Sequence, residues 1–63
     1  MHYALYVARK ERRLKQSDVA RKLNIHSVTY SRKERGELDF SLSEAFTLAR
    51  MFDTTVDELF KGT

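Results

Sequence analysis

One stretch, from Gln16 to Gly36, constrains the fold of this chain more than any other part of its sequence. The segment 16–23 has apolar residues at helical spacing, and they form one narrow stripe of Val19, Ala20 and Leu23. Asn24 follows, and asparagine is a common substitute for glycine where a helix ends in a left-handed residue. The segment 27–35 predicts a second helix, and Gly36 behind it is a helix-stop signal. The stretch therefore predicts two short helices joined by a tight turn.

The second of these helices carries few apolar residues with which to bury itself. Its large apolar side chains are Val28 and Tyr30. Helical periodicity gathers short polar groups and one guanidinium on one face, which consists of Ser27, Val28, Ser31 and Arg32. This face is either an ordinary solvated surface or a surface that contacts another molecule.

The rest of the chain extends the helical pattern. Its 63 residues include no proline and two glycines, and they show neither a hairpin dipeptide nor a long β-branched run. At this length the chain is expected to form a single domain, 1–63. The predicted fold class is all-α, a compact five-helix bundle. The expected helices span about residues 3–13, 16–23, 27–35, 42–52 and 56–61.

Apolar spacing is clearest in the predicted helix 42–52, which we expect to be the core helix. Its apolar positions follow the 3.6-residue repeat and are Leu42, Ala45, Phe46, Leu48, Ala49 and Phe52. Ser41 with Glu44 makes a capping box at its start, and Thr55 with Glu58 makes another at the start of the last helix.

Charge divides the chain into two unlike halves. Residues 1–36 contain ten Lys/Arg and three Asp/Glu, whereas residues 37–63 contain two and six. The net charge of +3 therefore combines a basic first half with an acidic second half. The basic half is expected to face a polyanion, and charge kept for solubility is the alternative.

A set of residues at fixed offsets resembles the helix-turn-helix of the phage-repressor and Cro family, also called the XRE or lambda-repressor-like family: Gln16, Ala20, Ile25, Glu34 and Gly36. The resemblance continues without a gap from about Leu5 to Phe60. It implies a sequence-specific transcriptional regulator of the repressor type. Such a protein binds double-stranded DNA with the helix 27–35 in the major groove.

The resemblance also suggests which residues would contact DNA. Base edges would be read by one face of the helix 27–35, which carries Ser27, Val28, Ser31 and Arg32. Val28 suits a thymine methyl group, and Arg32 suits the acceptors of a guanine. Phosphates would be bound at the start of one helix and at the end of the next, by Lys15, Gln16 and Arg35.

A structural ion pair is implied as well. In the family, an arginine at the offset of Arg9 pairs with the glutamate two residues before the stop glycine, which here is Glu34. A bidentate pair of this kind would lock the first helix to the end of the third. The alternative is that Arg9 is one more solvated charge.

Several positions depart from the family pattern. Lys15 and His26 stand where Ser or Thr usually caps a helix, so Ser27 could take over the second cap and shift the helix start. Lys33 replaces an apolar residue: either its stem packs while its ammonium reaches water, or the helix is rotated. The loop 37–40 is acidic where relatives are basic, and it is not expected to contact phosphate favourably.

A module of this size covers little DNA, so we expect a homodimer that binds half-sites about 34–36 Å apart, or a multiple of that. The dimer contact is expected in the acidic second half, with Phe40, Phe60 and the exposed parts of the helices 42–52 and 56–61 as candidates. A different interpretation of the same fold is a protein-interaction module, such as an antitoxin or adaptor. The basic first half argues against that interpretation.

Other classes of function have little support. An enzyme is not expected, because the sequence shows neither a Ser/His/Asp or Cys/His set nor a phosphate-binding loop. With no cysteine, and His2 and His26 as the histidines, neither a metal nor another cofactor is expected. The lack of cysteine and of any long apolar run predicts a cytoplasmic protein without a membrane segment.

Overall fold

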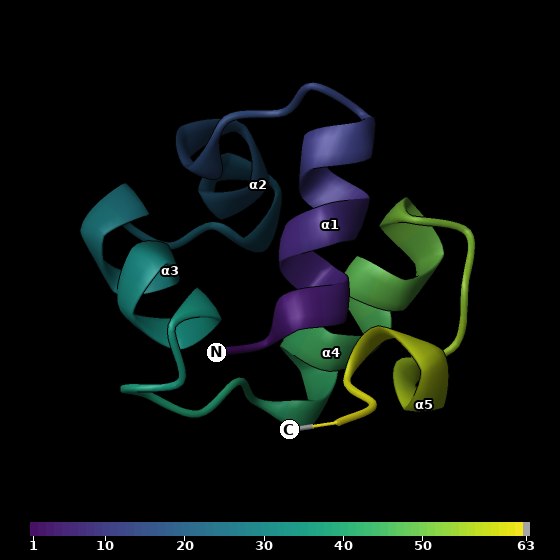
Figure 1. Ribbon diagram of the computed structural model, residues 1–63. Coiled ribbons are helices and arrows are strands. Elements are labelled where there is room, and N and C mark those ends of the chain that lie inside the picture. The colour runs from purple at the N-terminus through teal and green to yellow at the C-terminus, as the bar shows by residue number, and fades with distance from the viewer. Residues whose placement is uncertain (63) are drawn as a thin grey trace.

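The computed structural model describes residues 1–62, which form five α-helices and, over that range, no β-strand (Figure 1). The helices are α1 (Tyr3–Glu11), α2 (Gln16–Leu23), α3 (Ser27–Glu34), α4 (Leu42–Met51) and α5 (Val56–Leu59). This architecture confirms the predicted all-α, five-helix fold.

Four of the helices end one or two residues before the predicted positions. The chain leaves α1 and α4 through Arg13 and Asp53, whose φ angles of 55° and 54° are left-handed and cannot continue a right-handed helix. Asn24 has the same conformation, with φ at 58°, directly after α2. For α3 and α5 the differences lie at the cap residues, where helix boundaries are least sharply defined.

The predicted capping box at the start of α4 is present, and one of the two hydrogen bonds of the box predicted at the start of α5 is present. The Ser41 hydroxyl accepts a hydrogen bond from the Glu44 N–H at 3.1 Å, and the Glu44 carboxylate accepts one from the Ser41 N–H at 2.9 Å. The Thr55 hydroxyl accepts one from the Glu58 N–H at 3.1 Å. These bonds satisfy N–H groups that a helix start leaves free, so local sequence sets where α4 and α5 begin.

In Figure 1, α1 runs through the middle of the molecule, with α2 and α3 on one side and α4 and α5 on the other. Each helix contributes to a buried apolar core, as does the residue that follows α4: Leu5, Val19, Ala20, Tyr30, Leu48, Phe52 and Leu59. Tyr30 is the contribution of α3 to this core. The third helix therefore adds little apolar surface to the core, and Val28 and Arg32 are its exposed residues.

The core helix does not bury all the apolar residues that its pattern predicted. Leu42 is 69% exposed and Phe46 is 50% exposed, whereas Ala45, Leu48 and Ala49 are buried. At about 100° per residue, the apolar positions of α4 cover an arc of roughly 160°, and Leu42 and Phe46 lie at one edge of it. Four other short helices do not cover so wide an arc in a bundle this small.

Phe40 and Phe60, the predicted dimer contacts, lie beside each other in the structure, and their role in a dimer stays a prediction. Both rings are partly buried against the core, and both contact the ring of His2. The ring centroids of Phe40 and Phe60 are 5.5 Å apart, and those of His2 lie 5.5 Å and 5.1 Å from them. Contacts within the chain therefore cover part of the surface of both rings.

Candidate nucleic-acid interface

The turn between α2 and α3 sets the start of α3. The Ile25 N–H donates to the Ala20 carbonyl at 3.0 Å, which closes the left-handed turn at Asn24, and the Ile25 side chain packs against the core. Nδ1 of His26 accepts a hydrogen bond from the Val28 N–H at 3.2 Å. His26 is therefore the N-cap, and α3 begins at Ser27, so the cap is not shifted to Ser27.

This start brings the predicted base-reading residues to the surface on one side of α3. Val28 is 62% exposed, Arg32 is exposed, and Ser27 and Ser31 are partly exposed. The Val28 side chain is therefore open to contact with another molecule.

A shallow groove runs between the start of α2 and the exposed side of α3. Its walls contain every predicted DNA-contacting residue except Arg32: Lys15, Gln16, Ser27, Val28, Ser31 and Arg35, together with Ser17. The predicted phosphate-binding residues and the predicted base-reading residues therefore meet in one concave surface.

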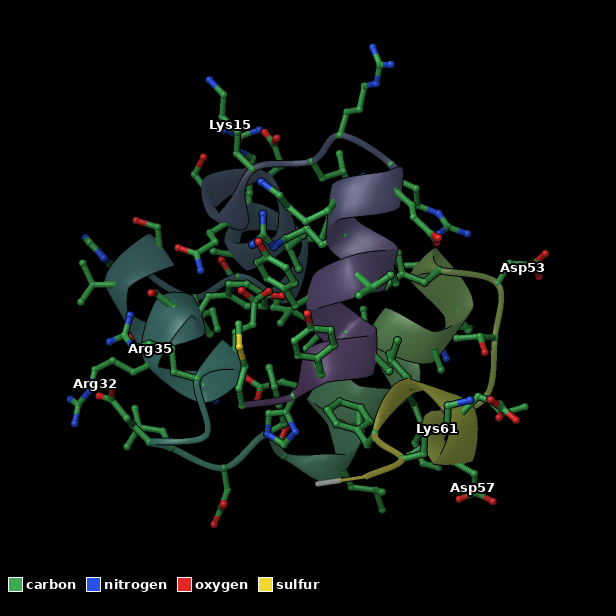
Figure 2. The ribbon with its side chains drawn as sticks, viewed as in Figure 1. Lys15, Arg32, Arg35, Asp53, Asp57 and Lys61 are labelled. Atoms are coloured by element: carbon green, nitrogen blue, oxygen red, sulfur yellow. The ribbon has the colours of Figure 1, made fainter. Side chains whose placement is uncertain are left out.

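The charges of the molecule are separated in space as they are in sequence. Figure 2 shows Lys15, Arg32 and Arg35 along the α2 and α3 side, while Asp53 and Asp57 lie on the opposite side, around α4 and α5. A polyanion would therefore be attracted to the face that holds the groove.

Two guanidiniums of this face share one carboxylate. Nε of Arg35 donates to Glu37 at 2.8 Å, Nε of Arg32 donates to the other oxygen of Glu37 at 3.3 Å, and Nη1 of Arg35 donates to the Ser31 hydroxyl. The bonds from Arg35 and Arg32 lower the pKa of the Glu37 carboxyl, so it stays ionised.

The side chain of Gln16 does not lie as the sequence suggested. Its amide was expected to help bind a phosphate, but Nε2 donates to Oε1 of Glu34 at 3.0 Å, on the inner side of α2. A phosphate contact at this helix start would depend on the second amide hydrogen, on the free backbone N–H groups of α2 and on Lys15. Asp18 accepts the Lys15 N–H at 2.8 Å and partly caps the helix.

The ion pair implied between Arg9 and Glu34 is present and buried, with side-chain exposures of 7% and 1%. Nε and Nη2 of Arg9 donate to the two Glu34 oxygens at 2.8 Å and 3.1 Å, and Nη1 donates to the Leu14 carbonyl at 2.9 Å. The Tyr30 hydroxyl donates to the same carboxylate at 2.7 Å. With Gln16, these donors tie α1, α2 and α3 to one buried carboxylate.

The protonation of this cluster follows from its contacts. Burial alone would raise the pKa of the Glu34 carboxyl, but hydrogen bonds from Arg9, Gln16 and Tyr30 outweigh it and hold the pKa below its ordinary value. Burial and the bond to Glu34 raise the pKa of Tyr30, so its hydroxyl remains a donor. The arrangement of α1, α2 and α3 thus depends on the ionised Glu34 carboxylate and its hydrogen-bond donors.

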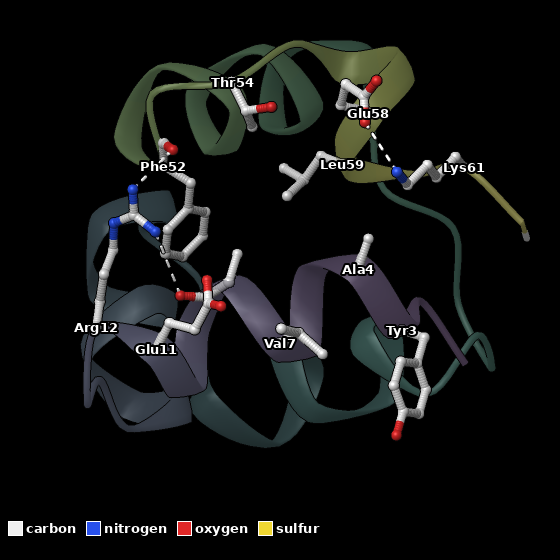
Figure 3. Close-up of a pocket in the computed structure, with 11 residues that line it drawn as sticks. Tyr3, Ala4, Val7, Glu11, Arg12, Phe52, Thr54, Glu58, Leu59 and Lys61 are labelled. Carbon is white, nitrogen blue, oxygen red and sulfur yellow. Dashed lines mark hydrogen bonds and ion pairs between the residues drawn. The ribbon is translucent and has the colours of Figure 1, made fainter.

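A second groove lies between α1 and α5, away from α3 (Figure 3). Val7, Phe52 and Leu59 make its apolar walls, and none of the predicted contact residues lines it. Nη2 of Arg12 donates to the Phe52 carbonyl at 2.8 Å near one end.

Residues 1–62 hold no group of three His, Asp or Glu side chains placed to bind a metal ion. Across the same residues, no helix is long and apolar enough to cross a bilayer.

Two helices joined by a tight turn, the second of them with an exposed polar face, define a helix-turn-helix domain. A family model described as Helix-turn-helix matches residues 5–59. The chain therefore belongs to this family, of the phage-repressor and Cro (XRE) type, whose members are DNA-binding regulators and not typically enzymes. Neither a curated protein nor a solved structure matches the chain significantly.

Proposed function

We propose that this protein is a sequence-specific, double-stranded DNA-binding transcriptional regulator of the repressor type. It docks with α3 in the major groove and with the start of α2 on the sugar-phosphate backbone. The observation that carries the proposal is the concave surface in which Lys15 and Arg35 lie beside Ser27, Val28 and Ser31. Docking of this kind brings base-reading and phosphate-binding groups onto the duplex together.

Each group in the proposed interface has a task that suits its chemistry. Arg32 donates to the O6 and N7 acceptors of a guanine, and Val28 packs against a thymine methyl group. Ser27 and Ser31 form short hydrogen bonds with little base preference of their own. Lys15, the start of α2 and Arg35 bind phosphates, which contributes much of the affinity and makes it depend on salt.

The proposed DNA-binding form is a homodimer. The longest axis of the bundle is 24 Å, shorter than the roughly 34 Å that separates equivalent positions one turn apart on the duplex. A single copy therefore reads one half-site, and a second copy is needed for the next.

Among the surfaces expected from the sequence, the exposed apolar surface of α4 is the proposed dimer contact. Leu42 and Phe46 are large apolar side chains that the bundle leaves uncovered. Phe46 borders a groove between α4 and α5 with Arg50 on one wall and Asp57 on another. In a two-fold contact a patch meets a copy of itself, so an apolar centre with both charge signs at its rim is self-complementary.

The test is a selection from random duplexes, followed by measurement of the dissociation constant at two salt concentrations. We expect one enriched sequence, an affinity that falls steeply with salt, and weaker salt-dependent binding to unrelated duplexes. The matched control is Lys61→Ala, because Lys61 lies by α5 on the far side and its loss should leave affinity unchanged (Figure 2). Failure to retard any duplex at low salt would contradict the proposal and favour the protein-interaction module.

A further inference from the structure

The residue that follows Gly36 is held over the end of α3 by the backbone itself. The Glu37 N–H donates to the Arg32 carbonyl at 2.9 Å and the Gly36 N–H donates to the Lys33 carbonyl at 3.1 Å, which is the Schellman arrangement. Gly36 has a φ of 87°, a conformation that favours glycine. This turn directs Glu37 back along the helix toward the two arginines of the proposed DNA-binding face.

The Glu37 carboxylate contacts each arginine through a side nitrogen. It accepts from Nε of Arg32 at 3.3 Å and from Nε of Arg35 at 2.8 Å. Both terminal nitrogens of Arg32 remain outside these bonds, and Figure 2 shows Arg32 extending outward from α3. A guanine contact through O6 and N7 can use those terminal nitrogens end-on, so Glu37 leaves the proposed base-reading end of Arg32 available.

We infer that Glu37 is a specificity-determining residue that positions Arg32 for a guanine, an inference that rests on the proposed function. Held at Nε, the guanidinium has fewer orientations to lose when it binds a base. The same carboxylate repels phosphates near the end of α3, and this weakens binding to every duplex. Glu37 thus lowers overall affinity and raises the preference for the correct base.

These two effects give Glu37 a signature that a simple repulsive charge lacks. Removing a repulsive charge raises affinity for cognate and unrelated duplexes by the same factor. If the carboxylate also positions Arg32, its removal leaves that guanidinium less well oriented. The affinity for the cognate duplex then rises by a smaller factor than the affinity for an unrelated duplex. The ratio of the two affinities therefore separates positioning from repulsion.

The experiment compares Glu37→Gln with Asp39→Asn on three duplexes at one salt concentration: the selected sequence, the same sequence with the guanine read by Arg32 replaced, and an unrelated duplex of equal length. Asp39→Asn is the matched control, since it removes the same charge from an exposed position in the same loop. Both positions are exposed, and circular dichroism checks that each variant is folded.

For Glu37→Gln we expect tighter binding to the unrelated duplex. We also expect the discrimination at the guanine, which is the ratio of affinities for the selected and the guanine-substituted duplex, to drop about three- to tenfold. That drop is part of the discrimination that a full bidentate contact provides. For Asp39→Asn we expect tighter binding to all three duplexes with unchanged discrimination. The drop should vanish in an Arg32→Ala background.

If discrimination is the same in the two variants, the inference is wrong while the proposed function stands. If Arg32→Ala leaves a base preference unchanged, the inference is wrong while the proposed function stands. If the protein shows no base preference at all, the proposed function and the inference are both overturned.

Discussion

The ammonium of Lys33 lies 2.7 Å from a carboxylate oxygen of Glu44, and both side chains are largely buried, at 15% and 14% exposure. Glu44 also accepts the Ser41 N–H in the capping box of α4. One carboxylate therefore starts α4 and ties it to the last turn of α3. Burial alone would raise the pKa of Glu44, but the bonds from Lys33 and Ser41 outweigh it and lower the pKa.

Lys33→Met should lower the free energy of unfolding by about 1–3 kcal/mol, between the values for exposed and for buried ion pairs. The methionine retains the packing of the lysine stem but leaves Glu44 without its cation. Urea denaturation measures the change. Lys22→Met, at an exposed position of α2, is the control and should shift stability by no more than about 0.5 kcal/mol. Equal stability for both variants would show that the pair contributes nothing.

Glu34→Ala should be among the most destabilising substitutions in the chain, at about 3–5 kcal/mol, because it leaves the buried Arg9 guanidinium uncompensated. The Tyr30 hydroxyl and the Gln16 amide lose the same acceptor. Thermal or urea unfolding gives the value, and exposed Glu11→Ala provides the comparison. A loss below about 1 kcal/mol would mean that the pair behaves as if solvated.

Stability should decrease in mild acid because of His2. Burial between Phe40 and Phe60 and the charge of the nearby N-terminal amine lower the pKa of His2 below 6.5, although Asp39 and Glu34 partly oppose this. Between the lowered pKa and 6.5, the unfolded chain binds a proton that the folded chain does not. The free energy of unfolding therefore falls as pH falls through that window.

Urea unfolding at a series of pH values between 7 and 5 would check this. The pH dependence should be smaller in His2→Gln than in the unchanged protein, whereas His26→Gln should retain the His2 contribution. If the two variants show the same slope, His2 is not responsible for it.

Arg32→Ala and Lys15→Ala should weaken DNA binding in different ways. Loss of a guanine contact costs about 1–3 kcal/mol at the cognate site and relaxes preference at one base pair. Loss of a phosphate contact weakens all duplexes about equally and reduces the slope of log affinity against log salt by about one. Binding titrations on cognate and base-substituted duplexes separate the two. If Arg32→Ala weakened every duplex equally, Arg32 would be a phosphate contact.

Phe46→Glu should prevent dimer formation, because it places a charge at the centre of the proposed self-complementary patch. Sedimentation of the protein alone and on a two-half-site duplex would show loss of the dimer, together with weaker binding. Tyr3→Glu is the matched comparison, since Tyr3 on α1 is also an exposed aromatic residue, at 65% against 50% for Phe46. Loss of the dimer in Tyr3→Glu instead would assign the contact to α1.

Much of the fold could be predicted from the sequence because its signals act over a few residues. Asn24 and Gly36 end helices as left-handed residues, and Ser41 and Thr55 start them as caps. Each of these features depends on groups within about four positions along the chain. The bond between Arg9 and Glu34 crosses 25 positions and was implied by family resemblance, since neither residue is distinctive among the many charges around it.

By itself, the sequence determined the five helices and where each begins, the turn between α2 and α3, and the separation of basic and acidic halves. Only the tertiary structure decided that Leu42 and Phe46 stay exposed, that Phe40 and Phe60 pack with His2, and that Gln16 turns toward Glu34. It also decided the partners of Lys33 and Glu37. The physical reason is that residues nearby in the sequence do not single out one partner for any of these side chains. The packing of the whole bundle decides which partner each side chain contacts.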